Sequence, residues 1–229
     1  MKSVAIITAR GGSKRIPNKN IKDFCGKPII AYSIEAAIEA GIFDEVMVST
    51  DSEEIAEISE RYGAKVPFMR SDATSNDYAG TADVILEVLN AYESLGELYD
   101  VFACIYPTAP FITSGKLADA FLLFEDKGAD AVISITKFEY PPQRAFIVES
   151  GVVKYQYPQF EKSRSQELEP VYHDCGQFYV CSAYEFKKHH SLVLPKTIPF
   201  IIPEEEVQDI DTPSDWKVAE AKYKALNWK

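Results

Sequence analysis

Strand-like apolar runs alternate with amphipathic helical patterns over residues 4–135. The strand-like runs cover residues 4–7, 45–50, 66–68, 101–106 and 131–135. Helical spacing marks residues 29–38, 84–92 and 117–124, and a further helix begins at 51 and ends at 63. Later strand-like runs at 176–180 and 198–202 precede a helix that begins at 212. Strands that alternate with helices form parallel sheets with right-handed crossovers. The sequence therefore predicts an α/β fold with a doubly wound, mostly parallel sheet.

The alternating pattern breaks after Lys137. Two strand-like pieces flank Gly151 and indicate a hairpin, and an irregular charged stretch continues to Glu169. An insertion into the sheet explains this better than a second domain, because strand-like composition returns afterwards. We therefore predict a single domain over residues 1–229 with an insertion at about 137–174.

Length and composition indicate an ordinary globular protein. The chain has 229 residues, enough for one α/β domain with a sizeable core, and its 46% of hydrophobic residues lie in short blocks. No block is long enough to cross a bilayer, and the first apolar run is too short for a signal peptide. The four cysteines lack the spacing of a zinc or redox motif, as expected of reduced thiols. We therefore place the protein in the cytoplasm and expect no membrane partner.

Charge is unevenly distributed along the chain. The formal net charge of −11 argues against binding nucleic acid or an anionic membrane through a broad basic face. Residues 1–27 nevertheless carry seven cations and one acid, a net of +6, which leaves −17 on residues 28–229. A small cationic patch on an acidic protein indicates a discrete anionic ligand and no nucleic-acid partner.

Most of these cations lie in residues 9–20, ARGGSKRIPNKN, directly after the first strand-like run. The dinucleotide and P-loop glycine patterns are both absent. Glycines still let backbone amides approach an anion, and hydroxyl and cationic side chains supply hydrogen bonds and charge. The alternative is a solvated basic loop. Because open α/β proteins bind ligands at the carboxyl ends of their strands, we favour a phosphate site.

Four pieces of the sequence lie in order at predicted strand ends. They are Arg10-Gly-Gly-Ser-Lys14 with Lys19-Asn20, Val48-Ser-Thr-Asp51, Tyr106-Pro-Thr-Ala-Pro110 and Asp209-Ile-Asp211-Thr212. Together they resemble the CMP-sugar synthetases, the cytidylyltransferases that activate nonulosonic acids. Within that family the chain looks most like the pseudaminic acid cytidylyltransferases, through Tyr140-Pro-Pro-Gln-Arg-Ala145, Arg164-Ser-Gln-Glu-Leu168 and His173-Asp-Cys-Gly-Gln-Phe-Tyr179. Where sialic-acid enzymes usually carry a glutamine, this chain has Tyr106.

The resemblance implies a Rossmann-like nucleotidyltransferase that transfers CMP from CTP to the anomeric hydroxyl of pseudaminic acid and releases pyrophosphate, for surface polysaccharide biosynthesis or flagellin glycosylation. The residues it assigns to CTP are Arg10, Gly11, Gly12, Ser13, Lys14, Lys19, Asn20, Arg70 and Thr81. Among them Arg10 and Lys19 are expected to stabilise phosphate charge during catalysis. Arg70 also suits an exposed surface position. The alternatives are CMP activation of legionaminic, N-acetylneuraminic or 3-deoxy-octulosonic acid, or a catalytically silent nucleotide-binding regulator.

Asp209 and Asp211 are the candidate metal ligands. Two carboxylates one residue apart in an extended segment point to the same side, and such hard oxygen ligands suit Mg²⁺. The alternative is that Asp211 assists the helix cap at Thr212 while Asp209 is solvated. The general base is Asp211 or a water held by the metal.

The expected substrate is an acidic nine-carbon sugar. Arginine side chains suit its carboxylate, whereas amide, imidazole and hydroxyl side chains suit its other substituents. The candidates are Tyr106, Gln143, Arg144, Arg164, Gln166, His173, Gln177 and Tyr179. His173 also suits a structural interface histidine, and Tyr179 a core position. By resemblance the insertion mediates a homodimer and closes the neighbouring subunit's sugar pocket. Alternatively, its aromatic residues cover the hairpin within one chain.

Overall fold

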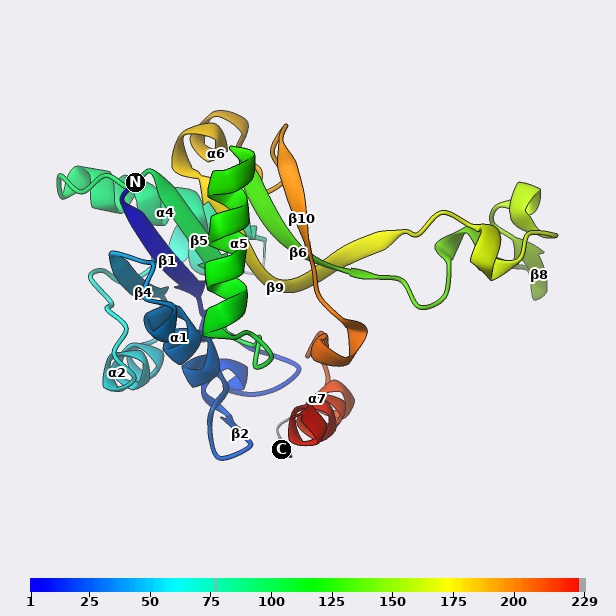
Figure 1. The fold of residues 1–229 in the computed structure, drawn as a ribbon. Helices are drawn as coiled ribbons and strands as arrows, with labels where there is room; N and C mark the ends of the chain where they lie inside the picture. The colour runs from blue at the N-terminus through cyan, green and yellow to red at the C-terminus, as the bar shows by residue number, and fades with distance from the viewer. Residues whose placement is uncertain (77, 227–229) are drawn as a thin grey trace.

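The computed structural model describes residues 1–76 and 78–226, which fold around a six-stranded sheet (Figure 1). Its strands in spatial order are β10 (Thr197–Ile201), β6 (Ala131–Lys137), β9 (Tyr172–Ser182), β5 (Val101–Ile105), β1 (Ser3–Thr8) and β4 (Glu45–Ser49). Strands β4, β1 and β5 run parallel, as do β10 and β6, whereas β9 lies antiparallel between β5 and β6. The predicted mostly parallel α/β sheet is therefore confirmed, with one antiparallel strand inside it.

Helices cover both faces of this sheet. They are α1 (Ile29–Ala40), α2 (Glu53–Arg61), α3 (Asp72–Ser75), α4 (Thr81–Ser94), α5 (Ser114–Lys127), α6 (Ala183–His189) and α7 (Pro213–Leu226). Apolar residues of α1, α2 and α5 pack with one set of alternate sheet residues, and those of α4 and α6 pack with the other set. This is the doubly wound arrangement. None of the described helices is both long and apolar enough to cross a lipid bilayer.

Local sequence explains most element boundaries. Strand β5 is apolar and buried along its whole length, as a strand covered on both faces must be. Gly41 ends α1 in the left-handed region with φ of 63°, and the Ser52 hydroxyl caps α2 by accepting from the Ile55 N–H at 3.4 Å. The strand expected at 66–68 does not form. Pairing with β4 stops at Lys65, because Pro67 has no N–H to donate to a ladder.

Short elements complete the described chain. They are the strand pairs β2 (Asp23–Phe24) with β3 (Lys27–Pro28) and β7 (Phe146–Glu149) with β8 (Val152–Tyr155), and the 3₁₀ turns η1 (Lys19–Ile21), η2 (Pro142–Arg144), η3 (Pro158–Phe160), η4 (Ser165–Glu167) and η5 (Glu204–Glu206). The pair β7–β8 is the hairpin expected around Gly151, which has φ of 78°. The turn thus uses the conformational freedom of glycine.

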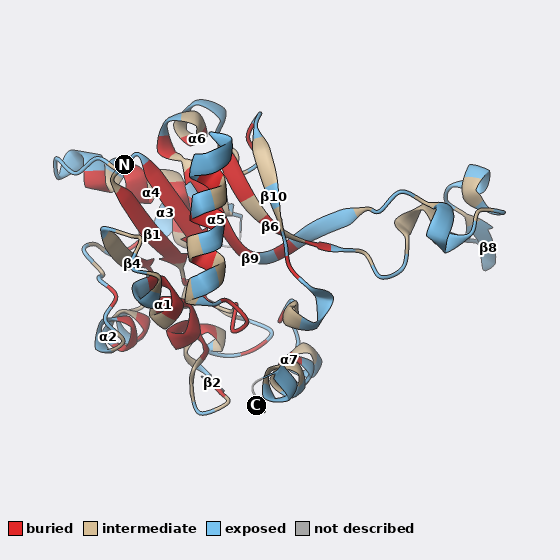
Figure 2. Ribbon diagram, viewed as in Figure 1, coloured by how far each residue is buried: buried red, intermediate tan, exposed pale blue. Residues whose placement is uncertain are grey.

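Residues 138–171 form an arm that projects from the body, the body being the rest of the described chain (Figure 1). Strands β6 and β9 run side by side out of the sheet to its root, and β7 and β8 lie at its far end. Most of the arm is exposed, in contrast to the buried strands of the body (Figure 2). Its exposed large hydrophobic residues are Tyr140, Phe146, Ile147, Val148, Val152, Val153 and Tyr157.

The C-terminal helix α7 packs beneath the N-terminal loop. Trp216 and Ala219 share a buried cluster with Ile16, Phe24 and residues of α1. The Phe24 ring meets the Trp216 ring edge to face at 5.5 Å between centroids. Aromatic contacts of this kind contribute beyond the area they bury. The two ends of the described chain therefore fix one another.

Candidate active site

The glycine-containing loop after β1 is held by the segment that follows β4 and by the turn η1. The Gly11 N–H donates to Asp51 Oδ1 at 2.7 Å, and Asn20 Nδ2 donates to the Arg10 carbonyl at 2.9 Å. A Cβ on Gly11 would lie 3.1 Å from the Ser52 Cβ, closer than such atoms normally approach. Gly11 is therefore needed for the close approach of the two loops, whereas the space around Gly12 is open.

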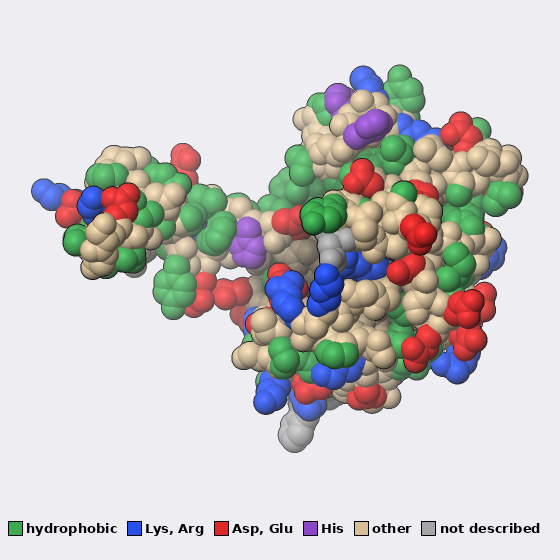
Figure 3. Space-filling model, turned by 180° about the vertical axis from the view of Figure 1, so that it is seen from behind, with side chains coloured by type: hydrophobic (Ala, Val, Ile, Leu, Met, Phe, Trp, Pro, Cys, Tyr) green, Lys and Arg blue, Asp and Glu red, His purple; other side chains and the backbone are tan. Residues whose placement is uncertain are grey.

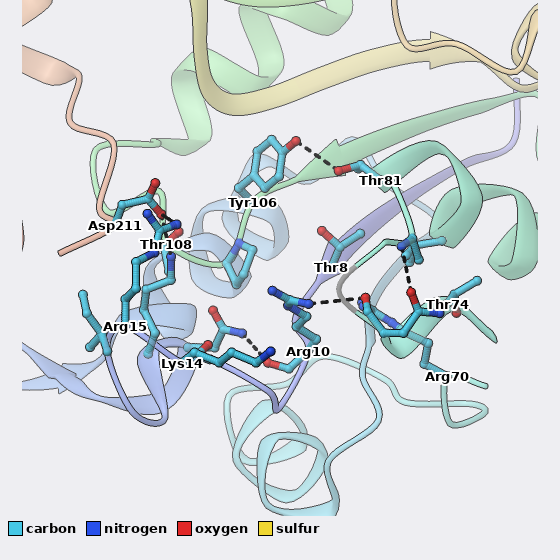
Figure 4. Close-up of a pocket in the computed structure, with 18 residues that line it drawn as sticks. Thr8, Arg10, Lys14, Arg15, Arg70, Thr74, Thr81, Tyr106, Thr108 and Asp211 are labelled. Atoms are coloured by element: carbon cyan, nitrogen blue, oxygen red, sulfur yellow. Dashed lines mark hydrogen bonds and ion pairs between the residues drawn. The ribbon is translucent and has the colours of Figure 1, made fainter. Parts of the chain in front are cut away.

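A cavity of about 460 Å³ lies at the carboxyl ends of β1 and β5 and is called the first cavity here (Figure 4). Of the predicted site residues it is lined by Arg10, Ser13, Lys14, Lys19, Asn20, Arg70, Thr81, Tyr106 and Asp211. It is also lined by Thr8, Arg15, Asn76 and Thr108, which the sequence reasoning did not assign. Figure 3 shows Lys and Arg side chains gathered beside a hollow on this face of the body. The cavity thus has the charge and position expected of a phosphate site.

Lys19 and Arg15 both approach the Asp211 carboxylate. Lys19 Nζ donates to the Ile210 carbonyl at 2.8 Å and lies 3.7 Å from Asp211 Oδ1, while Arg15 lies 2.8 Å from the same oxygen. These contacts join the N-terminal loop to the segment before α7. The signal for Arg15 was its place among the cations of residues 9–20.

Arg70 is a buried residue, so the surface alternative for it is wrong. Its side chain donates to the Ser49 carbonyl at 2.6 Å and to the Ser49 hydroxyl at 3.1 Å. Burial lowers the pKa of the Arg70 guanidinium, and the carboxylates of Asp51 and Glu87 oppose that shift. Arginine remains charged even so, because its usual pKa is far above neutrality. Arg70 therefore supplies a fixed positive charge at the wall of the first cavity.

A second cavity, of about 510 Å³, adjoins the first. The two share Lys19, Tyr106, Thr108 and Asp211. The second cavity is further lined by the predicted residues His173, Tyr179 and Asp209, and by Asp174, Cys175, Gly176 and Val207. Residues from the loop after β1, the end of β5, strand β9 and the segment before α7 thus meet at one junction.

Five predicted sugar residues lie outside both cavities. Four are on the arm: Gln143 Nε2 donates to the Glu169 carbonyl at 2.9 Å, Arg144 donates to the Ser165 hydroxyl at 3.3 Å, Gln166 lines a smaller cavity of about 230 Å³, and Arg164 precedes η4. The fifth, Gln177, is buried in the body, where Nε2 donates to the Glu206 carbonyl at 2.6 Å. Within one chain these residues are therefore not brought to the cavities.

Asp209 and Asp211 both face the second cavity, in line with the expectation that they point to one side. No group of three or more acidic, histidine or cysteine side chains suited to a metal occurs within residues 1–76 and 78–226. Mg²⁺ in nucleotide enzymes is commonly held by one or two carboxylates, with substrate phosphates and water as the other ligands. Two carboxylates beside a cationic cavity fit that type of site.

The sequence model of the family described as "Cytidylyltransferase" matches residues 4–179. The chain belongs to the cytidylyltransferase family. Over 225 residues this cytidylyltransferase is 43% identical to the pseudaminic acid cytidylyltransferase of Campylobacter jejuni, with 98% of this chain and 97% of the relative covered. It is 31% identical to the CMP-N,N′-diacetyllegionaminic acid synthase of Legionella pneumophila, with 99% and 98% covered. The family expected from the sequence is confirmed.

A solved structure of CMP:2-keto-3-deoxy-manno-octonic acid synthetase complexed with CTP has the same fold. Its TM-score with this cytidylyltransferase is 0.71 at 19% identity, and the match covers 99% of this chain and 100% of that one. The residues matched by the family model end at Tyr179 and so exclude Asp209 and Asp211. Asp211 is connected to the matched part through Lys19 and Arg15.

Proposed function

We propose that this cytidylyltransferase transfers CMP from CTP to the anomeric hydroxyl of pseudaminic acid, with CTP in the first cavity and the sugar in the second. The hydroxyl gives its proton to a general base, for which Asp211 is the candidate residue, and its oxygen attacks the α-phosphorus. The bond from that phosphorus to the bridging oxygen breaks, and pyrophosphate leaves. The observation that carries the proposal is the shared wall. Because Lys19, Tyr106, Thr108 and Asp211 line both cavities, the reacting atoms of two ligands can meet there.

The chief chemical problem is negative charge, since a triphosphate and a sugar carboxylate must come together. Arg10, Lys14 and Lys19 line the first cavity and supply cations to the phosphates. Lys19 is best placed for the reacting centre, because it lines both cavities and the Ile210 carbonyl already orients its amine. Fixed charges of this kind stabilise the transition state without having to reorganise during the reaction.

Mg²⁺ is the cofactor in this proposal, with Asp209 and Asp211 as its protein ligands. When bound, the metal supplies charge neutralisation at phosphate oxygens. Arg15 and Lys19 form ion pairs with Asp211 and also offset its charge. An ion pair with these side chains leaves Asp211 oriented towards the junction of the two cavities.

Pseudaminic acid is proposed as the sugar because the 43% identical relative carries that activity in its name and matches along its whole length. The lower identity to the legionaminic acid synthase makes that sugar the second choice. The product would serve a transferase that consumes a CMP-activated acidic sugar, for a surface polysaccharide or flagellin. The free cysteines, all within described residues, support a cytoplasmic location.

The arm supports a homodimer in which residues 138–171 of one subunit reach the other. Seven large hydrophobic side chains on it are exposed in the single chain. Among the described residues, buried Gln143 Oε1 and Arg144 Nε make no hydrogen bond. A second subunit would cover the apolar surface and bring arm residues such as Arg144 and Arg164 towards a sugar carboxylate. Light scattering coupled to size exclusion tests this, and a monomer at micromolar concentration would refute it.

The decisive experiment measures pyrophosphate release from CTP and Mg²⁺ in parallel with pseudaminic acid, legionaminic acid, N-acetylneuraminic acid, 3-deoxy-octulosonic acid and no sugar. Release that depends on pseudaminic acid is expected. Release with another of these acids would retain the reaction and change the substrate. CTP binding without release in any sample would replace the enzyme by a nucleotide-binding regulator.

A further inference from the structure

One wall of the first cavity is formed by a short segment that precedes α4. Thr74 of α3 and Asn76 line the cavity here, beside Arg70. Figure 4 shows Thr74 and Arg70 on the side of the cavity opposite Asp211. The Asn76 carbonyl also accepts from the Arg10 guanidinium at 3.3 Å. The position of this wall therefore affects both the space for a ligand and a cation that is expected to bind its phosphates.

Helix α3 is too short to hold this position by itself. It spans only Asp72–Ser75, and so short a helix forms too few hydrogen bonds to offset the free energy of nucleation. Ser71 occupies its N-cap position, but the Ser71 side chain does not cap the helix. Residues 71–73 and Asn76 are exposed, so that Thr74 is the buried residue of this segment. The order of α3 thus depends on contacts with another element.

Helix α4 provides these contacts. Three hydrogen bonds join the α3 segment to α4, and Glu87 accepts each of them. Glu87 Oε1 accepts from the Ser71 N–H at 2.8 Å, while Oε2 accepts from the Ser71 hydroxyl at 2.7 Å and from the Thr74 hydroxyl at 2.6 Å. Hydrogen bonds to an ionised carboxylate are stronger than those between neutral groups. One side chain therefore binds both the N-cap residue and the third residue of α3.

Glu87 stands on a rigid support. Its neighbours on α4, Ile85, Val88 and Leu89, are buried in a cluster with residues of the sheet. Glu87 itself lines neither the first nor the second cavity. Any effect of its hydrogen bonds on a ligand must therefore pass through α3.

We infer that Glu87 is a positioning residue for the nucleotide, which holds α3 so that the wall made by Thr74 and Asn76 is formed before CTP binds. The inference rests on the proposed function, since it takes CTP as the ligand of the first cavity. A wall that is already ordered increases affinity, because binding then requires less loss of conformational freedom. If the wall is formed in only a fraction of the molecules, the apparent dissociation constant rises by the reciprocal of that fraction.

Glu87→Ala and Glu87→Gln form the central comparison, measured as the dissociation constant for CTP by calorimetry without sugar. Both variants lose the same charge. Alanine removes all three hydrogen bonds and is a good helix former, whereas glutamine can accept from the Ser71 N–H and donate to the two hydroxyls. Glu87→Ala should weaken CTP binding about tenfold, the value for a wall formed in roughly one molecule in ten.

The glutamine variant should stay within about threefold of the parent protein, because it keeps hydrogen bonds to α3. Equal affinities for CTP in the alanine and glutamine variants would overturn the inference, since the charge of Glu87 rather than its contacts would then decide. If the parent protein binds no CTP, the proposed function itself fails. That result differs from a variant that matches a parent protein able to bind CTP.

Glu93→Ala is the matched control on the same helix. The Glu93 carboxylate pairs with Lys187 of α6 at 2.6 Å and so binds a different element. Its removal should leave the dissociation constant for CTP within about twofold of the parent value, as expected for an exposed ion pair. A loss as large as that of Glu87→Ala would mean that the effect belongs to α4 as a whole, which would refute the inference.

Hydrogen exchange tests the structural step without any ligand. In Glu87→Ala the amides of residues 71–76 should exchange faster than in the parent protein, while those of the buried strand β5 should be unchanged. Addition of CTP should slow exchange in residues 71–76 again. Unchanged exchange in this segment would show that other contacts hold α3 and would overturn the inference.

Steady-state kinetics separates positioning from general damage. In Glu87→Ala the KM for CTP should rise with the dissociation constant, while kcat and the KM for the sugar stay within about twofold of the parent values. The reason is that Asp211 lies across the cavity from the displaced wall (Figure 4). A rise in the KM for the sugar as large as that for CTP would contradict a role for Glu87 that is confined to the nucleotide.

Discussion

The body and the arm differ in how far a single chain covers its own apolar side chains and provides partners for its own polar atoms. In the body, the side chains around the first cavity come from several strand ends and are tied to one another, as Lys19 is to Ile210 and Arg70 is to Ser49. In the arm, apolar side chains are exposed. Of the three buried side-chain polar atoms that make no hydrogen bond within the described chain, two belong to Gln143 and Arg144 of the arm and one, Oε1, to Gln177 of the body. The first cavity is therefore formed within one chain, whereas the candidate sugar residues on the arm line neither the first nor the second cavity of their own chain.

The substitution with the largest expected effect lies in the body. Lys19→Ala should lower turnover by about 10²–10³-fold, because it removes a fixed cation from the junction of the two cavities. Pyrophosphate release measures the change. Lys22→Ala is the matched control, since the Lys22 amine lies over the Trp216 ring, 4.6 Å from its centroid, and lines neither cavity. Similar rates for the two variants would remove Lys19 from the site.

Replacing residues 139–170 with a short glycine–serine linker tests directly whether the arm is needed for the sugar but not for CTP. Turnover with sugar should fall at least about a hundredfold, because two candidate carboxylate ligands are lost and each charged hydrogen bond contributes roughly 1.5–3 kcal/mol. The dissociation constant for CTP should stay within about twofold of the parent value. The protein should also become monomeric by light scattering. A truncated chain that turns over sugar normally would refute any role for the arm.

Asp211→Asn tests the metal ligands of the body. The Mg²⁺ concentration for half-maximal rate should rise about tenfold, since one of two proposed carboxylate ligands is lost. Binding of Mn²⁺ followed by electron paramagnetic resonance gives a readout that is independent of turnover. The control is Asp215→Asn, because Asp215 caps α7 by accepting from the Thr212 N–H at 2.7 Å. If only the control changed the metal titration, Asp211 would be returned to a structural role.

Arg144→Ala should have the smallest of these effects. We expect the KM for the sugar to rise about fivefold, near 1 kcal/mol, with little change in the KM for CTP. Lys154→Ala is the matched arm control, because Lys154 forms an exposed pair with Glu149 at 2.8 Å on the hairpin and lines neither cavity. A larger change in the KM for CTP than for the sugar would place Arg144 at the nucleotide instead.

The sequence predicted the body well because local rules apply there. Ligand residues follow strand ends, so the loop from Arg10 to Asn20 and the segment at Asp211 could be assigned to one edge of the sheet from the order of residues alone. The proposed strand at 66–68 was wrong, because Pro67 ends the ladder. Arg15 was missed since nothing local distinguishes it from Lys14. Its role depends on Asp211, far away in sequence.

Residues on β9 and the arm were harder to predict because their environment is not local. Gln177 suited a sugar ligand by type, yet it lies where the pairing of β9 with β6 shifts register between Ile133 and Ile135, and its buried side chain donates to the Glu206 carbonyl. At the same irregularity Asp174 Oδ2 accepts from the Tyr179 hydroxyl, a contact that a regular strand would not allow. For Arg144 and Arg164 the sequence indicates a carboxylate ligand, but the single chain keeps them outside the cavities. Their role stays a prediction.

The packing of α7 beneath the N-terminal loop has a consequence for synthesis of the protein. Ile210 and Trp216, which contact Lys19 and Phe24, are translated long after the loop, since Ile210 lies 191 residues after Lys19. Domains fold as units, and contacts between distant segments form only when both have emerged. A nascent chain therefore carries its cationic loop without the contacts from α7 until that helix has been made. The cavity proposed for CTP is completed only after α7 has docked.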